Sequence, residues 1–204
     1  MTSAPHRALP CIKRAPWGRS FVAMVSVCVA LLAGRLAKSD EAQTALENTV
    51  KASYLYNFAA HTEWPEGAFV RPDAPFIIGL AGDVPFAPAL ETGLRGKNLG
   101  GRKIVIQAVG TNEEAKRCQV LFIGAVTPER MARLLATVAA KPVLTISETE
   151  GFGKHGGILN LFRGESSLKF EANPAAATRV HLKLSSQLLK LARIVKDDAP
   201  PVKD

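Results

Sequence analysis

The spacing of apolar residues predicts that the chain opens its folded part with an amphipathic helix. A repeat of apolar side chains at helical spacing runs over residues 44–63. The stripe consists of Leu46, Val50, Tyr54 (or Leu55) and Phe58. The pair Trp64-Pro65 is expected to end this helix, because the residue before a proline is disfavoured in the helical region.

Alternating strands and helices are predicted next. Short apolar runs indicate strands at 76–81, 103–109, 120–124 and 143–147, and the segment 97–102 has the composition of a turn. Helices are expected after the first strand as far as Leu90, at 112–117, and at 128–139 with Thr127 as the N-cap. This order predicts an α/β fold: a central, mostly parallel sheet with helices on both faces.

The pattern changes after the glycine-rich segment 151–157. Two strand-like runs, 158–162 and 167–171, flank four turn residues and predict a β-hairpin. A short helix over 174–178, capped by Asn173, and a brief strand over 180–184 are expected to follow. A closing helix begins at Ser185 or Ser186 and is expected to run to Val195.

The first 37 residues have the pattern of a cleaved export leader. A basic start is followed by 14 uncharged residues, 21–34, and the first carboxylate is Asp40. This apolar run is shorter than the roughly 20 residues that a membrane-spanning helix needs. We therefore expect a signal peptide over 1–37, one α/β domain over 38–196, a frayed tail over 197–204, and a periplasmic location.

Removal of the leader changes the charge and the cysteine content. Five of the basic residues lie in it, so the formal net charge falls from +8 to about +3. That mild charge, without a basic stripe interleaved with aromatics, argues against nucleic acid as a partner. Cys11 and Cys28 also leave, so Cys118 is unpaired within the mature chain, and its apolar neighbours predict a buried thiol.

No motif of the mature chain assembles a catalytic, cofactor or metal site. The segment 151–156 has the spacing G-x-G-x-x-G, but a strand-like run follows it where a dinucleotide site needs a helix, so a glycine-rich connection is the better interpretation. His61, His155 and His181 are far apart and lack metal-ligand spacing. The serines at 185–186 are explained as helix caps. We expect no enzyme activity and no cofactor.

Two segments are candidate partner-binding surfaces. Tyr56 and Trp64, at the end of the first predicted helix, lie off its apolar stripe, and aromatics of this kind are common anchors in interfaces. The alternative is that they pack this helix onto the sheet. The second candidate is the glycine-rich loop, with Phe152, Lys154 and His155.

Several segments of the chain, in the same order, resemble the YfiR family of periplasmic proteins. They are KASYLYNFAAHTEWP (51–65), FIIGLAGDVPF (76–86), CQVLFI (118–123), PVLTISETEGFGKHGG (142–157), and then ILNLF, KFEAN and LKLSSQLLKLARIV. The resemblance covers about residues 48–195. It implies a non-catalytic regulator that binds the periplasmic domain of an inner-membrane signalling protein, a diguanylate cyclase, and represses it. Release of that repression raises cyclic di-GMP and promotes biofilm formation.

The resemblance also implies that such proteins can act as dimers and respond to redox state through paired cysteines. Here Ile78 and Gly79 occupy the first strand, where a partner for Cys118 would be expected, so disulfide-based control is in doubt. The alternative function is a periplasmic small-molecule-binding sensor domain. That alternative predicts a concave apolar pocket with a few polar groups near the carboxyl ends of the strands.

Overall fold

The computed structural model describes residues 41–165 and 167–196 of the 204-residue chain. The chain divides into two compact units, residues 1–44 and 45–204. Residues 41–44 belong to a helix, here called the N-terminal helix, that covers 41–60. The predicted leader over 1–37 and the predicted tail over 197–204 lie outside the described residues. No helix within the described ranges is long and apolar enough to cross a membrane.

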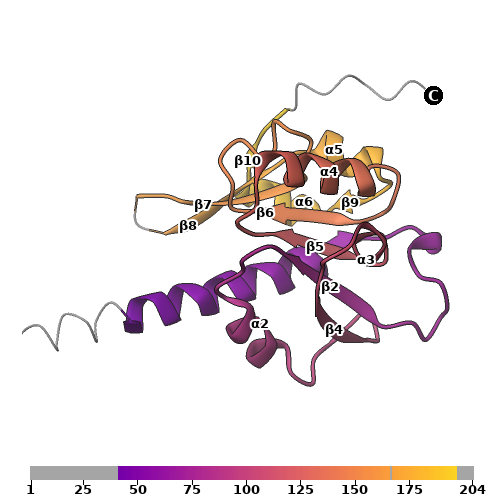
Figure 1. The fold of residues 1–204 in the computed structure, drawn as a ribbon, viewed down its shortest axis with the longest axis horizontal. Coiled ribbons are helices and arrows are strands. Elements are labelled where there is room, and N and C mark those ends of the chain that lie inside the picture. Colours follow the sequence, from indigo (N-terminus) through magenta and orange to yellow (C-terminus); the bar gives the residue numbers. More distant parts are fainter. Residues whose placement is uncertain (1–40, 166, 197–204) are drawn as a thin grey trace, which may run out of the picture. The chain divides into compact units, whose positions relative to one another are not determined.

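An eight-stranded sheet forms the centre of the fold (Figure 1). In spatial order its strands are β10 (Arg193–Ile194), β8 (Leu168–Ala172), β7 (Leu159–Arg163), β6 (Leu144–Ser147), β5 (Val120–Ile123), β2 (Phe76–Ala81), β4 (Arg102–Ala108) and β3 (Asn98–Leu99). The neighbours from β4 through β2, β5 and β6 to β7 are parallel. β8 is antiparallel to β7, and β3 is antiparallel to β4. The predicted α/β class, the mostly parallel sheet and the C-terminal hairpin are confirmed.

Helices cover both faces of this sheet, as predicted. The N-terminal helix and α2 (Ala87–Leu94) pack on one face, and α3 (Asn112–Lys116) and α4 (Pro128–Val138) pack on the other. Successive side chains of a strand point to opposite faces, so Phe122 of β5 lies with the first group and Leu121 with the second. Because both faces are buried, β5 is apolar at every position.

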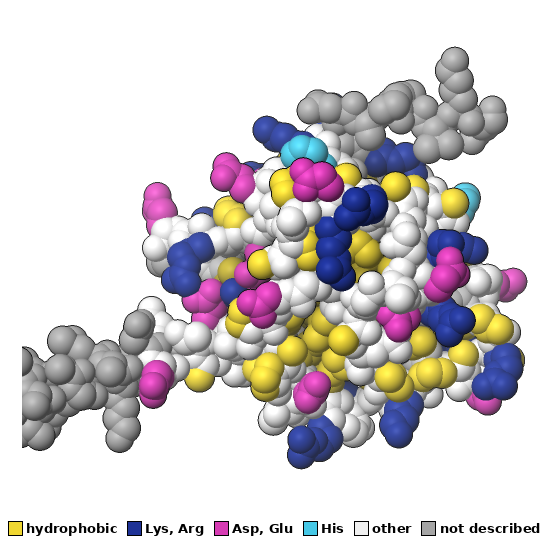
Figure 2. Space-filling view, in the orientation of Figure 1, with side chains coloured by type: hydrophobic (Ala, Val, Ile, Leu, Met, Phe, Trp, Pro, Cys, Tyr) yellow, Lys and Arg dark blue, Asp and Glu magenta, His cyan; other side chains and the backbone are white. Residues whose placement is uncertain are grey.

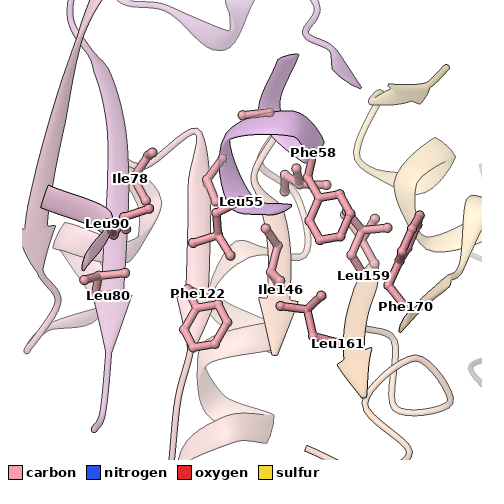
Figure 3. Close-up of a cluster of buried hydrophobic side chains, with 14 of the residues drawn as sticks. Leu55, Phe58, Ile78, Leu80, Leu90, Phe122, Ile146, Leu159, Leu161 and Phe170 are labelled. Atoms are coloured by element: carbon pink, nitrogen blue, oxygen red, sulfur yellow. The ribbon is translucent and has the colours of Figure 1, made fainter. Parts of the chain in front are cut away.

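The N-terminal helix lies against the sheet through Leu55 and Phe58 (Figure 3). Figure 3 shows both side chains directed at residues of β2, β5, β6, β7 and β8. The ring of Phe58 lies 4.8 Å from that of Phe170, centroid to centroid. Tyr54 is only partly buried, and its hydroxyl donates to the carbonyl of Leu168 at 3.0 Å. The helix therefore joins β8, more than a hundred residues away in sequence, to the core.

The predicted apolar stripe of this helix is wrong in its first half. Leu46 and Val50 are 67% and 37% exposed. The next residue in each case faces the body of the domain, where Glu47 pairs with Arg163 and Lys51 pairs with Glu148. In the first turns of the helix, the residues that face the domain are therefore one position later than the apolar repeat predicts. Ion pairs, rather than apolar contacts, hold these turns against the domain.

The helix also ends earlier than the predicted residue 63. It stops at residue 60, and β1 (Thr62–Glu63) pairs antiparallel with β9 (Lys183–Leu184) in a separate two-stranded sheet. The amide of Ser185 donates to the carbonyl of His61, which extends the same link. Since a two-residue strand exists only through its partner, the local pattern could not indicate it. The predicted strand over 180–184 is correspondingly reduced to its last two residues.

The closing helix is shorter than expected as well. α6 (Ser186–Leu191) ends four residues before Val195, and β10 follows it as an edge strand parallel to β8. The predicted N-caps of three helices are confirmed. A backbone amide at the start of each helix donates to the side chain of its cap, which is Thr127 for α4, Asn173 for α5 (Pro174–Arg179) and Ser185 for α6. A 3-10 helix, η1 (Glu66–Ala68), was not predicted.

The segment 97–102, predicted as a turn, is a tight hairpin. β3 and β4 are joined by Gly100 and Gly101, which have φ values of 55° and 77°. A two-residue connection with positive φ at both positions matches the right-handed twist of the flanking strands, and glycine adopts it without strain. β3 thereby protects one edge of the parallel sheet.

Candidate partner-binding surfaces

Tyr56 and Trp64 lie at the same cavity, beside the β3–β4 hairpin. Both are partly exposed, and they line a cavity of about 330 Å³ together with Phe69, Phe76 and Arg102. The ring of Trp64 meets Phe76 edge-on at 5.1 Å between centroids. Trp64 therefore both packs on the sheet and borders the cavity, so the two interpretations of this residue from the sequence are compatible.

Cationic groups stand over the aromatic rings of this surface. The Lys97 ammonium is 4.9 Å from the ring centre of Tyr56, and the Arg102 guanidinium is 3.8 Å from that of Phe69. Arg102 is held in place by donating to the carbonyls of Ala74 and Arg71, at 2.8 and 3.2 Å. The surface thus offers fixed aromatic area with positive charge at its border, a combination common in protein-recognition sites.

One polar atom of this surface has no partner. The indole Nε1 of Trp64 is buried, and no acceptor lies within hydrogen-bonding distance of it among residues 41–165 and 167–196. An unsatisfied buried donor costs free energy, about 1–3 kcal/mol. An incoming carbonyl or carboxylate that reached this atom would recover that cost.

The glycine-rich loop divides into a buried part and an exposed part. The ring of Phe152 is fully buried in the core on the α4 side of the sheet. Lys154 and His155 are exposed, and His155 Nδ1 lies 2.8 Å from the carbonyl of Gly151. Of the three loop residues expected to meet a partner, Phe152 is therefore positioned to anchor the loop, and only Lys154 and His155 have side chains at the surface.

The glycines of this loop are explained by its backbone conformation and by close packing, as the sequence indicates. Gly151 and Gly156 have φ values of 75° and 91°, and a Cβ atom at Gly157 would lie 2.1 Å from the ring of Phe152. β7 follows the loop, with no helix whose N-terminus could receive a pyrophosphate. The G-x-G-x-x-G spacing is explained by conformation and close packing.

The two candidate surfaces belong to different cavities. His155 lines a larger cavity between α4 and α5, of about 750 Å³, which neither Tyr56 nor Trp64 borders.

On the face in Figure 2, basic and acidic side chains are interspersed with small hydrophobic patches, without a stripe of one sign. The lining residues from α4 and α5 were not identified from the sequence, because they read as ordinary core-facing positions of two helices.

Cys118 is buried against β2, as its apolar neighbours predict. The thiol is 2% exposed and donates to the carbonyl of Glu114 at 3.3 Å. The pKa of this thiol is raised from 9.0 to about 11: burial raises it most, a hydrogen bond with Gln107 lowers it in part, and the Glu114 carboxylate raises it. A Cβ atom placed on Gly79 would lie 2.5 Å from the sulfur, so the first strand does face Cys118 at that position.

The raised pKa of Cys118 predicts a loss of stability in alkali. Below pH 9 the thiol is neutral in both states, whereas between pH 9 and about 11 the unfolded chain releases its proton and the folded chain keeps it. The free energy of unfolding should therefore fall with rising pH, by on the order of 2 kcal/mol more than in Cys118→Ala. Urea unfolding of both proteins from pH 7 to pH 11 measures the difference. Parallel pH profiles for the two would contradict the prediction.

The described ranges contain no candidate metal site. They hold no group of three or more His, Cys, Asp or Glu side chains that could bind a metal ion. Ser185 accepts the hydrogen bond of a helix cap, and the neutral Cys118 thiol is a poor nucleophile at physiological pH.

A family model described as YfiR/HmsC-like matches residues 48–193, most of the chain. The chain belongs to the YfiR/HmsC-like family. This family consists of periplasmic regulators of diguanylate cyclases that are generally non-catalytic. Its match covers the eight-stranded sheet, apart from the last residue of β10, and both candidate surfaces described above.

A solved structure is also similar to part of the chain. It is the crystal structure of a conserved domain protein from Vibrio cholerae O1 biovar El Tor str. N16961, with 11% sequence identity and a TM-score of 0.46. The similarity covers 59% of this YfiR/HmsC-like chain and 54% of the other. The chain thus matches about half the length of that protein.

Proposed function

We propose that this protein is a periplasmic, non-catalytic regulator that binds the external domain of an inner-membrane diguanylate cyclase and represses it, which lowers cyclic di-GMP. The observation that carries the proposal is the family match over residues 48–193. A repressor of this kind needs only a higher affinity for one state of its partner. A preference of about 10-fold, or 1.4 kcal/mol, already shifts the output appreciably.

The surface around Tyr56 and Trp64 is the better candidate for the contact. It combines partly exposed aromatic rings, two adjoining cations and the unsatisfied indole donor of Trp64. Such features are typical of residues that contribute most of the binding energy in interfaces. The exposed Lys154 and His155 form the alternative contact surface.

Deletion of the gene in its native bacterium should raise cellular cyclic di-GMP, because the cyclase would lose its repressor. Mass spectrometry of nucleotide extracts measures the rise, and expression of the intact gene should reverse it. Tyr56→Ala should fail to restore repression, whereas Asn57→Ala, at an exposed neighbour on the same helix, should restore it. An unchanged cyclic di-GMP level in every growth condition tested would contradict the proposal.

The same experiment distinguishes the two candidate surfaces. If Lys154→Ala or His155→Ala abolishes repression while Tyr56→Ala retains it, the glycine-rich loop makes the contact instead. All three variants should be present at wild-type levels, since each changes a side chain that is at least partly exposed.

A second candidate function is the recognition of a small molecule. The observation that favours it is the cavity of about 750 Å³ between α4 and α5, a size usual for ligand sites. A sensor domain and a repressor are compatible roles, since a ligand that binds one state of the protein would also change its affinity for a partner.

A further inference from the structure

The basic residues of the β3–β4 hairpin, beside the cavity of Tyr56 and Trp64, have no acidic partners. Between Glu91 and Glu113 the chain carries basic residues but no acid. These basic residues are Arg95, Lys97, Arg102 and Lys103. Among residues 41–165 and 167–196, no carboxylate lies within ion-pairing distance of any of them. The side chains that line the cavity include no Asp or Glu either, so the domain itself does not neutralise this positive charge.

The two faces of the hairpin divide these cations. Arg102 lies opposite Leu99, and both residues line the cavity. Lys103, the next residue along β4, points to the other face of the sheet, because successive side chains of a strand alternate. Lys97 is on the cavity side, where its ammonium stands over the Tyr56 ring. Lys97 and Arg102 are therefore the cations that an occupant of the cavity would meet.

The Arg102 side chain is held in place, yet part of its guanidinium has no acceptor. Both of its hydrogen bonds, to the carbonyls of Arg71 and Ala74, are made by Nη1. Within the described part of the chain, Nε and Nη2 donate to no other group. A carboxylate can accept from these two N–H groups side by side, which is a usual geometry of an Arg–carboxylate pair. Since the guanidinium is already fixed, forming such a pair orders little more of the side chain.

The cavity also calls for apolar surface in its occupant. Tyr56, Trp64 and Phe69 give it aromatic walls, and Val70, next to Phe69 in the chain, is 97% exposed. Exposed apolar groups gathered beside an aromatic cavity are typical of a surface that a partner covers. The volume of about 330 Å³ is at the small end of the range for ligand sites, which suits a side chain of a docked segment better than a large cofactor.

We propose that the cavity receives an acidic segment of the partner's external domain. An apolar side chain of that segment lies inside the cavity, and an adjacent Asp or Glu carboxylate pairs with Arg102 and Lys97. This inference rests on the proposed function, because it takes the repressed cyclase as the source of the segment. An anionic membrane surface carries the same charge, but a cavity with aromatic walls favours a protein side chain. A basic or uncharged segment would leave both cations without an acidic partner.

The first test uses the strain that lacks the gene. Lys97→Glu should fail to lower cyclic di-GMP in it, because the new carboxylate repels the acidic segment. Lys103→Glu is the matched control: it makes the same charge change at an exposed residue of the same hairpin, on the other face, and should repress as the unmodified protein does. Immunoblotting checks that both variants accumulate. Equal cyclic di-GMP levels with the two variants would overturn the inference and leave the repressor function standing.

The second test does not depend on the cyclase. Isothermal titration calorimetry at low ionic strength compares the purified protein's affinity for the blocked peptide Gly-Glu-Phe-Glu-Gly with that for the peptide carrying Gln at both Glu positions. The acidic peptide should bind about 10-fold more tightly. Lys97→Gln and Arg102→Gln should each reduce this advantage to about 3-fold or less, and Lys103→Gln should leave it unchanged.

The outcomes of the two tests separate this inference from the proposed function. Equal affinity for the two peptides, an advantage lost equally in Lys103→Gln, or binding to phosphatidylglycerol vesicles but to neither peptide would overturn the inference. If deletion of the gene leaves cyclic di-GMP unchanged while the peptides bind as expected, the repressor function fails and the preference of the cavity for acidic segments stands.

Discussion

Replacing Phe152 with alanine should lower the free energy of unfolding by about 3–5 kcal/mol, the usual cost of removing a fully buried phenylalanine. The ring lies in the core on the α4 side of the sheet, and the backbone of Gly157 packs directly against it. The amide of Gly157 also donates to the carbonyl of Phe152, so the loop closes around the ring it buries. Since glycine leaves no side chain to fill the space, the cavity left by the mutation would not collapse easily.

Urea unfolding, followed by circular dichroism, measures this cost. Lys154→Ala, two residues along the same loop but exposed, is the control and should change stability by no more than about 0.5 kcal/mol. A loss below about 1 kcal/mol in Phe152→Ala would show that the ring is not an anchor of the loop. A functional effect of this variant should be interpreted only after its stability has been measured.

Gly79→Ala should destabilise the domain by about 1–3 kcal/mol, because the added methyl group has no room. Its Cβ would lie 2.5 Å from the Cys118 sulfur and 2.7 Å from Cγ2 of Val109, both well inside van der Waals contact. Gly79 is itself buried on β2 at the centre of the sheet, where the backbone cannot shift without disturbing its neighbours on both sides.

A double-mutant cycle shows whether the sulfur causes the clash. Gly79→Ala combined with Cys118→Ala should cost at least about 1 kcal/mol less than the sum of the two single changes, since the second removes the obstructing atom. Gly93→Ala is the matched control: it lies in α2 with no atom within 4 Å of its Cβ position, and helix propensity predicts a small gain. Additive costs in the cycle would contradict a contact between position 79 and the sulfur.

The features that the sequence predicted correctly are those with a local cause. The strands β2, β4, β5 and β6 follow from unbroken or alternating apolar runs, and the caps at Thr127 and Asn173 follow from the residue type before a helix. The hairpin β7–β8 follows from two runs that flank a turn. In each case the signal lies within one short, continuous stretch of the sequence.

The features that the sequence did not predict depend on strands and side chains that lie elsewhere in the chain. β1 and β10 are two residues long and exist through pairing with β9 and β8. The rotation of the N-terminal helix follows from the ion pair of Glu47 with Arg163 on β7, which no apolar repeat encodes.

Neither candidate surface could be assembled from the sequence alone. Tyr56 and Trp64 could be named as aromatics off an apolar stripe, but their meeting with Phe69 and Arg102 requires the folded β3–β4 hairpin. Phe152 was named with the glycine-rich loop as a candidate partner contact, yet the loop folds inward and buries its ring. The cavity lined by Thr145 and Arg179 likewise arises only when α5 packs beside α4.

The bond between Tyr54 and Leu168 also has a consequence for how the protein is made. The two residues are 114 positions apart, so the first helix leaves the ribosome long before the strands it rests on exist. At a synthesis rate of 5–20 residues per second, the wait is roughly 6 to 23 s. During that time Leu55 and Phe58 have no core to enter. The nascent chain therefore leaves these apolar side chains uncovered until the later strands are made, and such uncovered apolar surface is what makes a partly made chain prone to aggregation.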